Sequence, residues 1–314
     1  MMANITTNKG TFWGYETDLQ VINSDGTYTF TTKKPRGYGL TIEFEIPFNT
    51  DGSIQHFTVT LYNISEKHAA VLKKGNHVKV TAGPTDLFSK ITEGTIISSE
   101  EDPDDNLDYP IKLNCLGGVD YSKTKNIYST AFGSKSSKHA VTIKKGEVIK
   151  WNTSKRLKVK LTFKKGTKPS TIMKRIIRQA KMTVKIKHLK TDKPIKKAYT
   201  LSAKPFNALQ SLAKKCGSKL YFTRDGWVID DFDKPDIYKD HIYLTSNELS
   251  SEPTQDESDD GKVTYSFTTA LDPRIDAGTI IDLNSRTLDG FVRVLSGEHD
   301  SADWTTQCEV EKIG

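Results

Sequence analysis

The feature that most constrains this chain is a period-two alternation of apolar and polar residues near its N-terminus. It recurs in residues 27–31, 41–46 and 55–62. Successive side chains of a β-strand point to opposite faces, so each stretch is typical of a strand with one buried and one exposed face. Turn residues such as 49–52 recur about every ten positions, which favours a barrel or a sandwich. We therefore predict an N-terminal β-barrel over residues 1–120.

One short helix interrupts this β-pattern. Ser65 is a plausible N-cap, residues 66–74 follow it with helical spacing, and Gly75 suits the C-terminal end of the helix. The alternation then resumes, which keeps the rest of this region in the same barrel. The further strands are predicted over residues 77–81, 92–98 and 111–115.

A compact mixed unit is predicted further along the chain. Residues 171–181 form a two-faced helix, with apolar residues on one side and Lys174, Arg175, Arg178 and Lys181 on the other. A second helix starts at Pro205, a residue favoured at the first helical position, and ends at Gly217. Flanking strands are predicted over 182–188 and 195–201, and a hairpin joins 219–222 to 227–229 through Arg224-Asp225-Gly226.

Two polar stretches, residues 119–140 and 232–261, are predicted as linkers or long loops. Strands are expected at 140–143, 157–163, 263–268, 279–283, 290–295 and 305–310. The predicted fold class is mainly β with a small α+β part: two β-barrels and one α+β domain. The predicted boundaries are 1–120 for the first barrel, 121–165 for a linker with connecting strands, 166–235 for the α+β domain, and 236–314 for a second barrel that strands from 121–165 complete.

Charge is distributed unevenly along the chain. The net charge is +7, but residues 140–200 carry 20 Lys and Arg against Glu147 and Asp192. The totals of 46 basic and 39 acidic residues leave 26 and 37 for the remainder, a balance of −11. Such a basic segment can face nucleic acid or an acidic protein surface. A nucleic-acid-binding protein using residues 140–200 is therefore the alternative function, although most aromatic residues there lie on alternating strands, where burial accounts for them.

The residues give no indication of catalysis, a cofactor or a metal. Cys115, Cys216 and Cys308 are odd in number and lie far apart, so buried free thiols are expected. The seven histidines lack metal-binding spacing, and 299–303 is predicted as a turn between strands. No nucleophile elbow, phosphate loop or calcium-loop register occurs. A hydrolase of cell-wall polymer is thus a third hypothesis without a motif.

The N-terminal sequence and the hydropathy pattern bear on location. Residues 1–6 lack a charged start followed by an apolar core, and no apolar run approaches the ~20 residues that span a membrane. We expect a protein that is made and folded in a cytoplasm and does not insert into membranes on its own.

Two stretches carry a resemblance to a known family. Residues 57–83 combine a strand, the sequence Leu-Tyr-Asn-Ile-Ser, a short helix, Lys-Lys-Gly and a strand ending in Ala-Gly, and residues 91–97 follow with Gly94 and Ile96. This order is similar to the N-terminal barrel of baseplate hub proteins from bacteriophage tails, especially those of Gram-positive hosts and related prophages. Near the C-terminus, residues 271–283, 290–294 and 299–304 follow the family's order of a Leu-x-Pro segment, strands and a His-x-x-x-Asp-Trp turn.

The resemblance implies two related barrels in each chain and a homotrimer. Three chains then form a pseudo-sixfold ring around a channel, and such a ring leaves no open contact surface. The implied partners are the tail tube or a distal tail protein on one face and a tip, spike or tail-lysin component on the other, with DNA only in transit.

The resemblance also implies a virion structural protein that is assembled in the host cytoplasm. Many relatives continue into a lytic domain, whereas this sequence ends at Gly314, so we expect no fused enzyme and no cofactor. The basic helix face of Lys174, Arg175, Arg178 and Lys181 is expected to contact acidic neighbouring subunits or the passing DNA.

Overall fold

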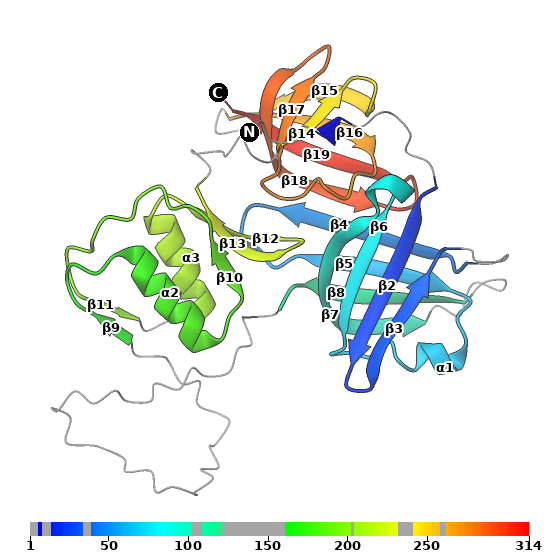
Figure 1. Ribbon diagram of the computed structural model, residues 1–314, viewed down its shortest axis with the longest axis horizontal. Helices are drawn as coiled ribbons and strands as arrows, with labels where there is room; N and C mark the ends of the chain where they lie inside the picture. The colour runs from blue at the N-terminus through cyan, green and yellow to red at the C-terminus, as the bar shows by residue number, and fades with distance from the viewer. Residues whose placement is uncertain are drawn as a thin grey trace, which may run out of the picture.

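Strands dominate the computed structural model, which describes residues 6–7, 14–33, 39–101, 109–119, 121, 161–201, 204–231, 241–257 and 262–313. The largest sheet has fourteen strands (Figure 1). Two smaller sheets pack with two helices in a separate α+β unit, defined here as residues 161–201 and 204–231. The prediction of a mainly β chain is confirmed.

The N-terminal half of the large sheet follows the predicted alternation. In β4, for example, Ile42, Phe44, Ile46 and Phe48 are buried on one face. The predicted helix is shorter than expected, and Ser65 sits at its N-cap position without a capping hydrogen bond from its side chain. The elements are β2 (Glu16–Asn23), β3 (Gly26–Thr31), β4 (Ile42–Asn49), β5 (His56–Tyr62), α1 (Glu66–Ala69), β6 (His77–Gly83), η1 (Thr85–Leu87), β7 (Ser89–Glu101) and β8 (Pro110–Gly117).

The C-terminal half contains two strands that the sequence pattern missed. Both fall in the stretch predicted as polar loop, and in the second of them Pro253 is the one buried residue, so no apolar alternation marks it. The elements are β14 (Ile242–Thr245), β15 (Leu249–Glu257), β16 (Val263–Ala270), β17 (Ile280–Asn284), β18 (Asp289–Asp300) and β19 (Thr305–Lys312), with β1 (Thr6–Thr7) parallel to β14.

Both halves of the large sheet repeat one strand order. The N-terminal half runs β2-β6-β7-β8-β5-β4, and the C-terminal half runs β14-β17-β18-β19-β16-β15. In both halves, strands at equivalent positions of the sheet also occur in the same order along the chain. The long strand of each half (β7 or β18) has a β-bulge where it pairs with the strand that follows it in the chain (β8 or β19). The halves differ at one end, because β2 pairs antiparallel with β6 whereas β14 is parallel to β17.

Strand β4 joins the two halves into one sheet. Its first residues pair with β5, and residues 45–49 pair antiparallel with residues 296–300 of β18. We call this β4–β18 contact the seam. The described strands follow an open path from β1 to β3, so they form no closed barrel.

The α+β unit has the predicted order of helices and strands. On α2 (Pro169–Ala180) the residues Ile172, Met173, Ile176 and Ala180 are buried, whereas the four basic residues of the opposite face are exposed. The other elements are β9 (Leu161–Phe163), β10 (Val184–Ile186), β11 (Tyr199–Leu201), α3 (Pro205–Lys215), β12 (Lys219–Thr223) and β13 (Gly226–Asp230).

The described parts of residues 121–165 lie against the α+β unit. Strand β9 pairs with β11, and the Tyr121 hydroxyl accepts a hydrogen bond of 2.7 Å from the Thr183 backbone N–H. The remainder of that range, including the predicted strands at 140–143 and 157–160, lies outside the described residues. Completion of the C-terminal half by this range therefore stays a prediction.

Three apolar clusters form the core, one in the α+β unit and one in each half of the large sheet. Cys115, Cys216 and Cys308 are free and buried, as the sequence predicts. Burial raises the pKa of the Cys115 thiol to about 12, which keeps it protonated and unreactive. Among the described helices, none is both long and apolar enough to cross a membrane.

Candidate functional site

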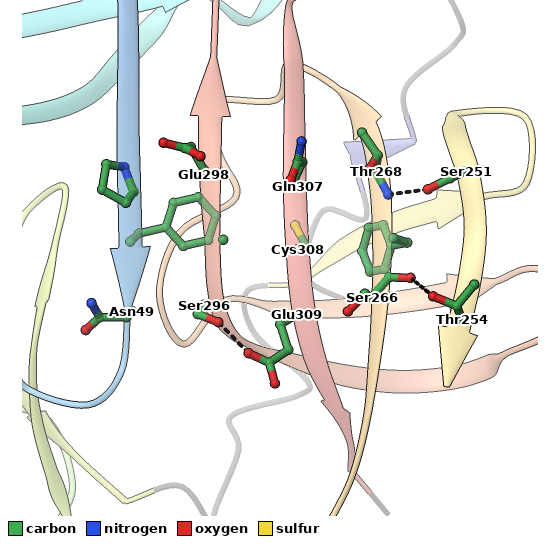
Figure 2. Close-up of a pocket in the computed structure, with 14 residues that line it drawn as sticks. Asn49, Ser251, Thr254, Ser266, Thr268, Ser296, Glu298, Gln307, Cys308 and Glu309 are labelled. Atoms are coloured by element: carbon green, nitrogen blue, oxygen red, sulfur yellow. Dashed lines mark hydrogen bonds between the residues drawn. The ribbon is translucent and has the colours of Figure 1, made fainter. Parts of the chain in front are cut away.

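A shallow groove of about 530 Å³ lies on the polar face of the large sheet, where the two halves meet. Figure 2 shows its polar side chains on neighbouring strands, among them Ser296 and Glu298 of β18, Gln307 and Glu309 of β19, and Thr268 of β16. The alternation of each strand places these side chains opposite the buried face, which carries Cys308 and Phe267. The groove therefore follows directly from the strand pattern.

The hydrogen bonds of this polar face repeat in both halves. In the C-terminal half, the Ser296 hydroxyl donates to Glu309 Oε2 at 2.6 Å. At the equivalent place in the N-terminal half, directly after the bulge of β7, the Asn114 side-chain amide donates to the Ser98 hydroxyl at 2.9 Å. The repeat thus extends from strand order to individual side chains on this face.

Carboxylates gather on the polar face at the seam. Glu45 of β4 lies directly opposite Asp300 of β18, with Glu298 two residues away on the same face and Glu43 along β4. Among the described residues, none of these four takes part in an ion pair. Burial raises the pKa of Glu298, and the neighbouring charges of Glu45 and Asp300 raise it further. The seam therefore presents uncompensated negative charge.

A buried ion pair lies beside the seam, in the segment between β16 and β17. The Asp272 carboxylate is fully buried and accepts hydrogen bonds from the Arg274 guanidinium, from Nε at 2.9 and 3.1 Å and from Nη2 at 2.6 Å. Asp272 also donates its backbone N–H to the Thr306 hydroxyl at 3.1 Å. The segment is therefore fixed to β19 by polar contacts in a dry environment.

The same segment contacts the α+β unit and the histidine of the predicted turn. The Arg224 backbone N–H donates to Asp276 at 2.5 Å, and the Arg224 guanidinium donates to the Pro273 carbonyl. Burial raises the pKa of Asp276 to about 6. His299 lies 3.1 Å from the Ile275 carbonyl oxygen through Nε2, and burial lowers its pKa to about 4, so it is neutral near pH 7. These contacts join the α+β unit to the sheet.

The His-x-x-x-Asp-Trp turn packs its tryptophan into the N-terminal half. The Trp304 ring stacks on Tyr15 at 4.8 Å between ring centroids and meets the Phe44 ring edge-on at 6.2 Å. Trp304 also has a positive φ of 50°, a left-handed conformation that is uncommon for a non-glycine residue. The turn lies between strands, as the sequence predicts, and its tryptophan is part of the contact between the two halves.

The four basic residues expected at an interface do not line the groove. Lys174, Arg175, Arg178 and Lys181 lie on the exposed face of α2, and the Arg175 guanidinium is 5.8 Å from the centroid of the Phe163 ring. The other described aromatic residues in or near the basic segment are buried or partly buried, which disfavours them as platforms for stacking nucleic-acid bases. They are Tyr199, Tyr221 and Phe222.

The described residues contain no group of three or more histidines, cysteines or carboxylates arranged to hold a metal ion. The sequence signal that could have located the acidic face is the position of the carboxylates within the alternation. Glu43 and Glu45 occupy the exposed positions of β4, and Glu298 and Asp300 the same face of β18. Their proximity depends on a pairing across about 250 residues of chain, which no local pattern reveals.

Searches with the sequence matched no family model and no curated protein. The structure does match solved phage tail proteins. The 43 kDa tail protein of prophage MuSo2 from Shewanella oneidensis is 12% identical, with a TM-score of 0.60 over 95% of this chain and 98% of that one. The tail protein from Neisseria meningitidis MC58 is 10% identical, with a TM-score of 0.59 over 96% and 97%.

A component of a bacterial secretion machine has a similar structure. The Escherichia coli c3393 protein of the type VI secretion system, itself described as similar to the phage T4 tail proteins gp27 and gp5, is 8% identical. It matches with a TM-score of 0.54 over 89% of this chain and 76% of its own. At such low identity these matches establish the fold. The chain has the fold of phage tail proteins and of hub-like proteins related to them.

Proposed function

We propose that this chain, which has a phage tail protein fold, is a structural subunit of a tail-tip or baseplate hub. Three copies would form a pseudo-sixfold ring that joins the tail tube to tip components and lines the channel. One observation carries this proposal: two halves with the same strand order are fused through the seam into a single sheet. A chain that already repeats one unit twice can form six similar units from three copies.

The seam supplies a template for the contact between copies. Within the chain, β4 of the first half pairs with the last residues of β18 in the second half, beyond those that pair with β17. In the repeat, β15 is the equivalent of β4, and the last part of β7, beyond the residues that pair with β6, is the equivalent of the last part of β18. Among the described strands, both have an edge without a partner strand. Repeating the seam between copies would place β15 of one copy on β7 of the next, which is a head-to-tail contact.

The bulges fix the register of this second contact. The bulges lie at the same place in both halves, so Ser98, directly after the bulge of β7, corresponds to Ser296, directly after that of β18. Following the strand pairs from these two residues outward shows that Thr254 of β15 corresponds to Glu45 of β4. Since Asn49 lies opposite Ser296 in the seam, residues 254–257 of one copy would run antiparallel to the end of β7 in the next. In this register Gln255 would lie opposite Glu101.

The acidic polar face suits a channel wall. DNA carries a dense negative charge, and a positively charged wall would bind its phosphates and hinder passage. Glu43, Glu45, Glu298 and Asp300 would instead repel it, and the hydroxyl and amide groups between them would keep the wall hydrated. In the proposed ring this face would be directed toward the DNA in transit.

The remaining parts of the proposal concern partners and location. The tail tube or a distal tail protein would dock on one face of the ring, and a tip, spike or tail-lysin component on the other. The subunit would be assembled in the host cytoplasm, reside in the virion and act without catalysis. The fold of the matched tail proteins supports this role.

The exposed basic face of α2 is proposed as a contact for acidic neighbouring subunits. Exchanging Lys174, Arg175, Arg178 and Lys181 for Glu should leave the free energy of unfolding nearly unchanged, since all four are exposed. It should weaken assembly into tails, measured as the yield of infectious particles after complementation of a deletion phage. Unchanged assembly and infectivity would remove this contact from the proposal.

Disulfide trapping tests the proposed head-to-tail contact. The native cysteines are buried, so a Gln255→Cys/Glu101→Cys variant has only its two engineered thiols available for oxidation. Oxidation at high protein concentration should give covalent dimers and closed covalent trimers on a non-reducing gel, because two strands in register bring Cα atoms within disulfide reach.

The single-cysteine variants are the matched controls. In a mixture, Gln255→Cys and Glu101→Cys should form the mixed dimer, and neither should form a dimer efficiently alone. Same-residue dimers would indicate a twofold contact instead, and no crosslinking in the double variant would contradict the proposed register.

A further inference from the structure

A second hollow lies in the α+β unit, away from the polar groove. It has a volume of about 300 Å³ and is lined by the start of α2, the end of α3 and the segment between β10 and β11. Its lining includes the apolar residues Pro169, Leu212, Ile195 and Ala198 together with the Tyr199 ring. We call it the lysine cleft, because Lys193, Lys197 and Lys215 also line it.

One wall of the lysine cleft is held in place by backbone and carboxylate contacts. The Thr191 backbone N–H donates to the Cys216 carbonyl at 3.0 Å, and the Ile195 N–H donates to the Thr167 carbonyl at 2.9 Å. Between them, Asp192 accepts hydrogen bonds from the Ser170 backbone N–H at 2.8 Å and from its hydroxyl at 2.6 Å. The cleft is therefore formed in the free chain, as ligand sites commonly are.

The three lysines of the cleft have no anionic partner in the part of the chain that the structure describes. Among the described residues, Lys193, Lys197 and Lys215 are exposed and none forms an ion pair. The nearest carboxylate in sequence, Asp192, is occupied at the start of α2. An apolar hollow with an uncompensated cationic rim is complementary to a ligand with an apolar centre and negative flanks.

The aromatic geometry disfavours a nucleic-acid base in this cleft. The Lys215 ammonium lies 5.7 Å from the centroid of the Tyr199 ring, and the Phe163 ring lies 6.4 Å from the same ring. Tyr199 is thus already packed by a cation and by a second ring, whereas single-stranded nucleic acid requires an open aromatic face for stacking.

We propose that the lysine cleft binds an acidic segment of another protein through one inserted apolar side chain. The apolar side chain would fill the hollow, and flanking carboxylates would meet the three lysines. This site lies on the α+β unit and does not depend on the proposed ring. Since the lysines are solvent-exposed, binding should weaken as ionic strength rises.

Fluorescence anisotropy with a labelled peptide Asp-Glu-Leu-Glu-Asp tests the proposal on the full chain. Lys193→Glu/Lys197→Glu/Lys215→Glu should weaken binding by about tenfold or more, because it replaces three attractive charge contacts with repulsive ones. The matched control Lys67→Glu/Lys73→Glu/Lys74→Glu makes the same change in net charge at exposed residues of the large-sheet region and should change affinity by less than about threefold. A peptide with Ser in place of the central Leu should bind clearly more weakly than the Leu peptide.

Four results would overturn the proposal. Equal losses in the two triple variants would show a general charge effect, and equal binding of the Leu and Ser peptides would show that the hollow is not used. Tighter binding of a single-stranded oligothymidylate of the same charge would identify the basic region as a nucleic-acid site. Absence of any peptide binding by the wild-type protein at low salt would likewise reject it.

Discussion

Gly297→Ala is expected to lower the free energy of unfolding by about 3 kcal/mol, at the upper end of the usual cost of overpacking. Gly297 lies at the centre of the seam, paired with Phe48 on one side and Cys308 on the other. A Cβ atom there would overlap the Gln307 carbonyl oxygen and lie 2.5 Å from Cζ of Phe48. Since a backbone oxygen cannot turn away as a flexible side chain can, β18 and β19 would have to separate locally.

Urea denaturation followed by circular dichroism measures this effect. Ser296→Ala is the control, because it changes the neighbouring position on the polar face and removes only the hydrogen bond to Glu309. It should cost about 1 kcal/mol. A Gly297→Ala variant no less stable than this control would contradict the close packing of β4, β18 and β19 at the seam.

Arg274→Met is expected to destabilise the chain by about 3 kcal/mol, because it leaves the fully buried Asp272 carboxylate without its cation. The double variant Asp272→Asn/Arg274→Met should cost clearly less than the single change, since it removes the uncompensated charge as well. The loss of stability in Arg274→Met measures how strongly the ion pair stabilises the segment that connects the C-terminal half to the α+β unit.

An exposed ion pair provides the comparison for the buried Asp272–Arg274 pair. Lys33 and Glu16 are 3.2 Å apart, and the Lys33 side chain is 67% exposed against 18% for Arg274. Lys33→Met should cost less than about 1 kcal/mol. Equal costs for Arg274→Met and Lys33→Met would contradict the buried character of the Asp272–Arg274 pair.

Local sequence patterns predict most of the helices and strands, but they fail for features that depend on residues far apart in the sequence. The sequence predicts the two-faced helix at residues 171–181, which is α2 (Pro169–Ala180), and the hairpin around Asp225, because amphipathic spacing and turn chemistry are local signals. Strand β15 was missed because it is an edge strand that buries only Pro253, so its residues carry no alternation.

The candidate site was the part that the sequence could predict least. The exposed position of Lys174, Arg175, Arg178 and Lys181 follows from helical periodicity, but the acidic face needs a contact between β4 and β18. That contact brings together strands from opposite ends of the chain, and pairing of distant strands has no sequence signal in a single chain.

Negative-stain electron microscopy of the wild-type protein at high concentration tests the central claim, that three copies close into a ring. We expect particles with threefold symmetry, six similar lobes and an open centre, with the α+β units as further density. Twofold particles, rings without a central opening, or monomers alone at that concentration would contradict it.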